Sequence, residues 1–141
     1  MIYKLVIPGT LPGLNEYLQA ERRRSGRYNC GNEMKQHWQA YICAFIRKDL
    51  GRKRIEKPVR LHYTFYEPTK RRDLDNIAAT AHKFVQDALV RSGVLPDDGW
   101  KYVRGFSDSF QVDRKEPRIE ILIEEINEDE EKTGGGDGGK K

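Results

Sequence analysis

The stretch that decides the fold is VRLHYTFYEPTKRRDLD, residues 59–75. Its first nine residues, 59–67, alternate between a largely apolar face and a more polar face, which predicts a strand with one side against a core. A proline ends this strand, and the basic turn Lys70-Arg71-Arg72 follows it. A helix is predicted to begin near Asp73 or Asp75, because either carboxylate can cap a helix N-terminus.

Two amphipathic helices are predicted from apolar residues that recur every three or four positions. The helix after the basic turn has a buried stripe formed by Ile77, Ala81, Phe84, Ala88 and Leu89. Gly93 suits the position just past the end of that helix. An earlier helix is predicted over residues 33–50 and is ended by Gly51. Its stripe consists of Met34, Trp38, Tyr41, Ile42 and Phe45.

Three further strands and two connecting segments complete the expected order. Strands are predicted over residues 2–7, 102–110 and 118–126, where short apolar runs are bounded by turn residues. Residues 8–18 contain prolines and glycines and are expected to form a loop, and the arginine-rich residues 20–31 are expected to form a mobile arm. The sequence therefore predicts an α+β fold, in which a small mixed β-sheet packs with two main helices in the order β-α-β-α-β-β.

The composition favours one domain that acts on a polyanion. The 141 residues carry a net charge of +4, and residues 1–126 carry +6 because the remaining tail is acidic. Residues 1–126 are predicted to be the domain, and residues 127–141, a Gly-rich charged tail, are predicted to be disordered. Two cysteines without a disulfide or zinc pattern, and the lack of a signal peptide or membrane span, favour a cytoplasmic protein.

Two acidic motifs are the candidates for chemistry. Asp73-Leu74-Asp75 lies where the strand and turn meet the second helix, and Asp97-Asp98 lies in the turn after that helix. The first two carboxylates are expected to converge only if the helix starts at or after Asp75. The helix would be roughly 25 Å long, so Asp98 can reach Asp73 only if a neighbouring strand or a partner subunit brings it back.

The acidic motifs have a catalytic and a structural interpretation. Three carboxylates without a nearby His or Cys suit Mg²⁺, with Mn²⁺ as a substitute, and such sites keep open positions for water and phosphate oxygens. Hydrolysis of a phosphodiester is the natural reaction of a site of this kind. The structural interpretation stays open, because an acid at a helix start is a common cap and Pro-Asp-Asp-Gly is a common turn.

The order of these motifs resembles that of a known family. The runs 70–76 (KRRDLDN), 87–89 (DAL) and 93–98 (GVLPDD) are together similar to the RusA family of Holliday junction resolvases. The early run 12–17 (PGLNEY) resembles the Asn-containing N-terminal loop of that family. The resemblance implies a homodimer that cuts branched DNA with Mg²⁺, and a bacterial, phage or prophage origin.

The resemblance also implies roles for individual residues. The essential acids of the family fall on Asp73, Asp75 and Asp98, which are therefore the expected catalytic residues and metal ligands. Together with the basic charge of the body, the resemblance gives the residues expected to bind DNA as Asn15, Arg22, Arg23, Arg24, Arg27, Lys70, Arg71, Arg72 and Asn76. The arginines of this set can also be an ordinary solvated surface.

One basic position departs from the family pattern. The catalytic basic residue of the family commonly lies four positions after the second acid, where this chain has Ala79. Lys83 is one helical turn further on and is the expected substitute, although it starts roughly 12 Å along the helix from Asp75. Lys70 or Arg72 could supply the charge instead.

The resulting prediction is a Mg²⁺-dependent, structure-selective endodeoxyribonuclease that resolves Holliday junctions in DNA recombination and repair by phosphodiester hydrolysis. The first alternative is a protein that binds branched DNA without cutting it, which the missing basic residue at Ala79 favours. The second is a metal-dependent nuclease that acts on flaps or RNA ends. The third is a structural or adaptor protein in which the acids are only caps.

Overall fold

A four-stranded mixed sheet forms the base of the structure, a computed structural model that describes residues 1–25 and 28–127. The strands are β1 (Ile2–Pro8), β4 (Val59–Glu67), β5 (Val103–Val112) and β6 (Arg118–Glu125). They lie in the order β1-β6-β4-β5, so that β5 is an edge strand. β6 pairs antiparallel with β1 and with β4, whereas β4 and β5 are parallel.

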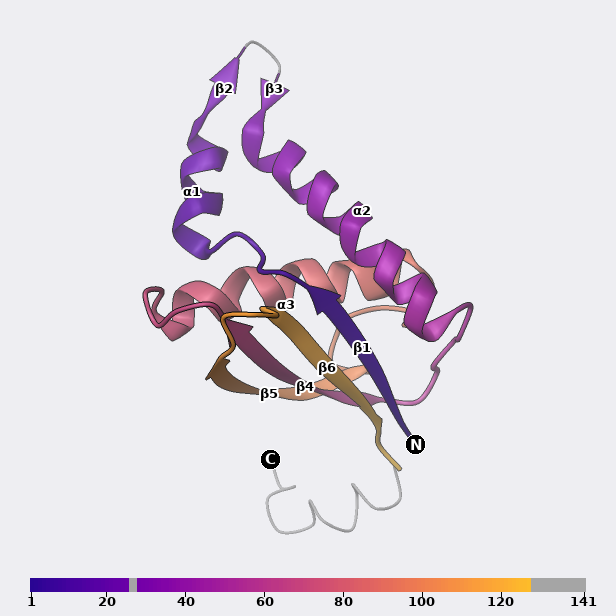
Figure 1. Cartoon of the computed structure of the whole chain (residues 1–141). Coiled ribbons are helices and arrows are strands. Elements are labelled where there is room, and N and C mark those ends of the chain that lie inside the picture. Colours follow the sequence, from indigo (N-terminus) through magenta and orange to yellow (C-terminus); the bar gives the residue numbers. More distant parts are fainter. Residues whose placement is uncertain (26–27, 128–141) are drawn as a thin grey trace, which may run out of the picture.

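Two long helices cover one face of this sheet. They are α2 (Cys30–Leu50) and α3 (Leu74–Arg91), and Figure 1 shows both on the same side of the strands. The inward face of β4, which includes Leu61 and Phe65, is fully buried against this helical layer. The buried stripe predicted for α3 is also confirmed, since Phe84 and its four predicted companions are all buried. The α+β class and the order β-α-β-α-β-β are therefore confirmed.

The predicted boundaries of these elements are close to the observed ones. β4 spans the predicted residues, α2 begins three residues before the predicted start, and β5 continues two residues beyond Phe110. Gly51 and Gly93 follow α2 and α3 with φ of 61° and 86°, the left-handed conformation that ends helices and that glycine adopts readily. In the described part of the chain, no helix is long and apolar enough to cross a membrane.

The segment between β1 and α2 is more regular than predicted. The expected loop over residues 8–18 ends at Gly13, because helix α1 (Leu14–Arg22) begins there. The expected mobile arm over residues 20–31 contains the end of α1, the short hairpin β2 (Arg24–Ser25) and β3 (Tyr28–Asn29), and the first residues of α2. Figure 1 shows α1 and this hairpin extending beyond the sheet together with the first half of α2. The loop prediction was therefore wrong from residue 14 onward. The described residues of the arm contain regular structure, and residues 26–27 of the predicted arm lie outside the described residues.

A capping interaction explains why α1 forms after a Pro- and Gly-rich run. The backbone N–H of Gly13 donates a 2.9 Å hydrogen bond to the Glu16 carboxylate, and Tyr17 N–H donates to the Gly13 carbonyl at 3.0 Å. A glutamate three positions after the cap satisfies a backbone donor that the helix leaves free. The ring of Tyr17 then packs edge-to-face on Phe84 of α3, with 5.5 Å between centroids. Burial raises the pKa of the Tyr17 hydroxyl to about 12, so it stays protonated at neutral pH.

The start of α1 is fastened to the first turns of α3. Asn15 N–H donates a 2.8 Å hydrogen bond to Oδ1 of Asn76, and the Thr80 hydroxyl donates to the Pro12 carbonyl. A Cβ atom on Gly13 would lie only 2.5 Å from Nδ2 of Asn76. The loop therefore needs a glycine at residue 13 because the two backbones approach so closely.

We predict that Gly13→Ala lowers the free energy of unfolding by about 1–3 kcal/mol, because the new methyl group displaces Asn76 and breaks its bond to Asn15. Urea denaturation followed by circular dichroism measures this change. Gly105→Ala is the matched control, since a Cβ atom there meets nothing within 4 Å. Equal stability of the two variants would contradict the close approach.

Candidate active site

The first acidic motif lies at the N-terminus of α3. Asp73 is the N-cap residue on extended backbone, with φ −69° and ψ 152°, and Asp75 lies in the first helical turn. The helix thus begins at Leu74, one residue earlier than the convergence of the two carboxylates was expected to require. Both aspartates are exposed, and the Asp73 side chain makes no capping hydrogen bond. Within the described residues neither carboxylate forms an ion pair, so both are open to a cation.

A buried ion pair fixes the turn that leads to these acids. Glu67, at the end of β4, is only 7% exposed. The Arg72 guanidinium donates two hydrogen bonds to the Glu67 carboxylate, from Nη2 at 2.8 Å and from Nε at 3.2 Å. Its Nη1 donates to the Leu11 carbonyl at 2.9 Å. Arg72 therefore joins β4, the loop before α1 and the start of α3, which places Asp73 at a fixed point of the structure.

A cleft of about 760 Å³ opens beside the first motif, between the turn 67–74 and the second half of β5. Its apolar lining comes from Leu74, Ile77, Phe110 and Val112. Its polar lining comes from Glu67, Thr69, Lys70, Arg72, Asp108, Ser109 and Gln111. Nε2 of His82 lies 2.8 Å from Oδ1 of Asp108, which holds that carboxylate in place. The cleft therefore combines an apolar surface with polar groups next to Asp73.

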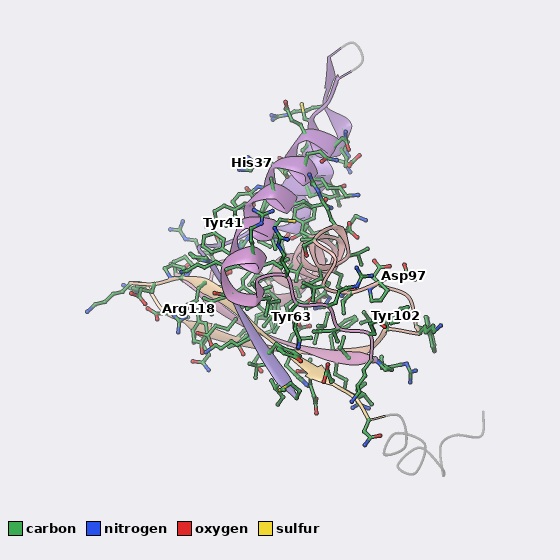
Figure 2. All side chains as sticks on the ribbon, turned by 90° about the vertical axis from the view of Figure 1, so that its right-hand side faces the viewer. His37, Tyr41, Tyr63, Asp97, Tyr102 and Arg118 are labelled. Carbon is green, nitrogen blue, oxygen red and sulfur yellow. The ribbon has the colours of Figure 1, made fainter. Side chains whose placement is uncertain are left out.

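The second acidic motif lies at the opposite end of α3. In Figure 1, β4 and β5 both point toward the start of α3, and the chain after α3 turns at the far end. Figure 2 labels Asp97 and Tyr102 in this region. Val59, the first residue of β4, pairs with Val103, and the Gly99 carbonyl accepts hydrogen bonds from Tyr102 and Val103. The Asp97-Asp98 turn is thus held beside the beginning of both strands.

The three predicted metal ligands are therefore far apart in one chain. α3 has 18 residues, which at 1.5 Å per residue separates its ends by about 27 Å. Among residues 1–25 and 28–127, no three His, Cys, Asp or Glu side chains gather closely enough to hold a metal ion. Exposed carboxylates suit Mg²⁺ by their chemistry, but within a single chain only Asp73 and Asp75 lie at the same end of α3.

The predicted basic residues occupy different surroundings. Nζ of Lys83 lies 3.9 Å from Asp87, whose carboxylate also contacts Lys35 and Gln39 of α2. Lys70 is exposed and lines the 760 Å³ cleft. Arg71 is exposed in the same turn. Of the three predicted charge donors, Lys83, Lys70 and Arg72, only Lys70 forms no ion pair within the described part of the chain.

The predicted DNA contacts of the N-terminal region lie on or near α1. Arg22 and Arg23 are exposed at the end of this helix. Arg24 is the first residue of β2, and Arg27 lies outside the described residues. Asn15 and Asn76 are brought together, but by the hydrogen bond that fastens α1 to α3.

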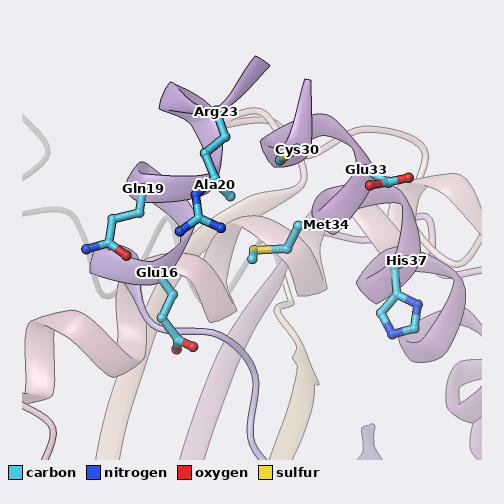
Figure 3. Close-up of a pocket in the computed structure, with 8 residues that line it drawn as sticks. All are labelled: Glu16, Gln19, Ala20, Arg23, Cys30, Glu33, Met34 and His37. Atoms are coloured by element: carbon cyan, nitrogen blue, oxygen red, sulfur yellow. The ribbon is translucent and has the colours of Figure 1, made fainter. Parts of the chain in front are cut away.

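A second cleft, of about 660 Å³, separates α1 from α2. Figure 3 shows its lining residues, which are Glu16, Gln19, Ala20, Arg23, Cys30, Glu33, Met34 and His37. None of the three predicted metal ligands lines either cleft, but Leu74, which lines the 760 Å³ cleft, lies between Asp73 and Asp75 in the sequence. The 760 Å³ cleft is therefore the one that adjoins the first acidic motif.

Sequence reasoning did not find the residues that β5 contributes to the site. Asp108, Phe110 and Val112 reach the neighbourhood of Asp73 only because β5 runs parallel to β4 and ends at the same edge of the sheet. The one available signal was the helix between two predicted strands, which is typical of a parallel pair. The partner of Arg72, Glu67, was also missed, although an acid that ends a buried strand next to a basic turn suggests such a pair.

A protein-family model matches most of the chain. The family described as Endodeoxyribonuclease RusA matches residues 17–124. A comparison with curated proteins found no match. The matched range begins in α1, ends in β6, and contains both acidic motifs.

We predict that Arg72→Ala lowers the free energy of unfolding by about 3 kcal/mol, because it leaves the buried Glu67 carboxylate without its partner. Arg71→Ala, one residue earlier and exposed, should change the same quantity by less than about 0.5 kcal/mol. Chemical denaturation of both variants measures the difference. If the two variants were equally stable, Arg72 would have no structural role and could serve DNA binding alone.

Proposed function

This chain belongs to the RusA family of endodeoxyribonucleases, and on that premise we propose that it hydrolyses Holliday junctions with Mg²⁺ at two sites, each built from both chains of a homodimer. The observation that carries this proposal is that the two acidic motifs lie at opposite ends of α3, a helix of 18 residues that is about 27 Å long. A symmetric dimer can bring the first motif of each chain to the second motif of the other, because a two-fold axis gives both chains the same contact.

The exposed edge of β5 is the surface best placed for this dimer. No residue of β5 is buried, and Phe106 and Val112 are 52% and 44% exposed. A two-fold axis through the middle of β5 would make β5 of the second chain run antiparallel to β5 of the first. The beginning of its β5, which follows Asp98 by five residues, would then lie beside the end of the first β5, near the start of α3 with Asp73 and Asp75. One operation therefore completes both acid sites.

Each composite site would offer Asp73 and Asp75 from one chain and Asp98 from the other. A divalent ion bound there would supply a Lewis acid for the phosphate and for the attacking water. The protein itself holds the carboxylates open to solvent, fixes Asp73 through the buried Glu67–Arg72 pair, and anchors the start of α3 through Asn76 and Thr80. These fixed contacts favour catalysis because they position the ligands before substrate arrives.

A lysine is the expected source of positive charge in the transition state. Lys83, one turn beyond Ala79, remains a candidate as the substitute for the family's basic residue, but its amine lies 3.9 Å from Asp87, whose carboxylate also contacts α2. Lys70 has more support, since it is exposed and lines the cleft beside Asp73. We therefore propose Lys70 as the principal charge donor in this chain, in place of the residue absent at Ala79.

DNA would be held mainly through its phosphates by exposed basic residues. Arg22, Arg23, Lys70 and Arg71 are the described members of this set, and Arg24 and Arg27 extend it by sequence. Affinity should fall steeply as salt rises, because phosphate contacts release bound counterions. A role in recombination and repair, and a cytoplasmic location in a bacterial or phage setting, belong to the same proposal.

A second candidate function is binding of branched DNA without cleavage. The specific observation in its favour is Ala79, which leaves the family's basic position without a charge. Cleavage assays on a labelled four-way junction, a flap and a linear duplex, each with Mg²⁺ or EDTA, distinguish the two candidates. Selective cutting of the junction in Mg²⁺ supports the proposed nuclease, and binding without cutting supports the alternative.

We predict that Asp73→Asn and Asp98→Asn are each inactive as pure proteins but recover cleavage when mixed. A mixed dimer contains one site with all three native acids, because the intact Asp73 and the intact Asp98 come from different chains. The measurement is nicking of the four-way junction in Mg²⁺ after the two variants are refolded together.

The matched control is a mixture of Asp73→Asn with Asp75→Asn, which should stay inactive, since both changes affect the same half of the site. Asp87→Asn alone should cleave normally, because Asp87 contacts α2 and lies far from the first motif. No recovery by the first mixture would place all three acids in one chain or remove Asp98 from the site.

We predict that Lys70→Ala lowers the cleavage rate by about two orders of magnitude, as expected for loss of one transition-state contact, and weakens junction binding by at most about tenfold, because Lys70 is one of several phosphate contacts. Lys83→Ala should have a smaller effect, because its amine is already engaged by Asp87. Single-turnover cleavage and gel-shift titration separate rate from binding. A hundredfold loss in Lys83→Ala with normal cleavage by Lys70→Ala would reverse the assignment.

A further inference from the structure

We propose that Trp100 of each chain docks in the cleft beside Asp73 of a second copy of this chain and thereby positions Asp98. This inference rests on the two-chain site proposed above. It adds the contact that would set the distance between the acids of the two chains.

Trp100 has the properties of an interface anchor. Its side chain is 93% exposed, the most exposed of the large hydrophobic residues in the described chain. An indole carries a large apolar area, and tryptophan is enriched among the residues that dominate protein interfaces. Its backbone is held, because its carbonyl accepts a 2.8 Å hydrogen bond from Nε of Arg104 and the preceding Gly99 carbonyl closes the turn. The indole therefore projects from a fixed point.

The 760 Å³ cleft beside Asp73 has the properties of a receptor for an indole. Leu74 and Val112 in its lining are 55% and 44% exposed, so both have apolar surface left to bury. The Phe110 ring stacks on the buried Phe65 with 5.1 Å between centroids, which makes that wall rigid. Ser109 and Asp108 supply oxygen atoms that can accept the indole N–H, a donor that usually finds a partner when buried.

The positions of anchor and cleft agree with the positions of the acids. Trp100 follows Asp98 by two residues, and Leu74 of the cleft follows Asp73 by one residue. When Asp98 of a second copy lies at Asp73, its Trp100 is within roughly 7 Å along the chain and can reach the cleft. A second copy is favoured over DNA as the occupant, because Leu74, Phe110 and Val112 give the cleft an apolar surface that matches an indole ring better than a charged phosphate chain.

The first test uses Trp100 as its own reporter. The chain has two tryptophans, so Trp38→Phe leaves Trp100 as the only one, with an aromatic ring kept at residue 38. In the dimer, we expect the fluorescence emission of Trp100 to lie at shorter wavelength than that of a solvent-exposed tryptophan. We also expect its quenching by acrylamide to be weak. Adding Val112→Glu, which places a charge on the rim of the cleft, should move the emission to longer wavelength and strengthen the quenching.

The second test measures the dimer by analytical ultracentrifugation. Trp100→Ala should raise the dissociation constant by about 30-fold or more, as for loss of an aromatic anchor. Combining Trp100→Ala with Val112→Glu should weaken the dimer by less than the product of the two single effects, because the two residues share a contact. Circular dichroism checks that each variant is folded, as expected for two exposed positions.

Two results would overturn the proposal. One is a Trp100 that is strongly quenched in the dimer, with an unchanged dissociation constant in Trp100→Ala. The other is an emission that shifts only when the four-way junction is added, which would assign Trp100 to base stacking. Recovery of cleavage by mixed Asp73→Asn and Asp98→Asn chains, together with either result, would leave the two-chain site intact and remove only the Trp100 contact.

Discussion

The parallel pairing of β4 with β5 is the constraint on which the candidate site depends. Parallel neighbours need a connection that returns along the whole length of the strands, and here α3 makes that return. The residues just before α3 and just after it must therefore lie at opposite ends of the sheet. The two acidic motifs occupy those two positions, so the fold itself keeps Asp73 and Asp98 apart within a chain.

The contacts around the first motif show how stability and function share residues. The buried Glu67 needs Arg72, and this need holds the turn before Asp73 in one conformation. Asn76, directly after Asp75, accepts a backbone hydrogen bond from α1 and leaves no room for a side chain at Gly13. Part of the run KRRDLDN therefore has a structural role that fixes the acids, while the acids themselves remain exposed and without ion pairs in the described residues.

Much of the sheet and both long helices could be predicted, because the residues that become buried are apolar and recur at regular spacing in the sequence. β4 alternates strictly, and α3 has an unbroken apolar stripe. α1 was missed because its start depends on one hydrogen bond from Gly13 to Glu16, in a run whose composition otherwise indicates a loop. The acids could be named from motif order, but the roles of Arg72 and Asn76 could not, since their partners Glu67 and Asn15 are defined only by tertiary contacts. The cleft beside Asp73 could not be predicted from the sequence either, because about half of its lining residues come from β5.

A crystal structure of the protein with Mn²⁺ tests the central claim most directly, because the ion identifies its own ligands. We predict two metal sites related by a two-fold axis, each with carboxylate oxygens of Asp73 and Asp75 from one chain and of Asp98 from the other, at about 2.2 Å from the metal, slightly longer than for Mg²⁺. A metal held by acids of one chain only, with Asp98 of both chains far from it, would contradict the two-chain site.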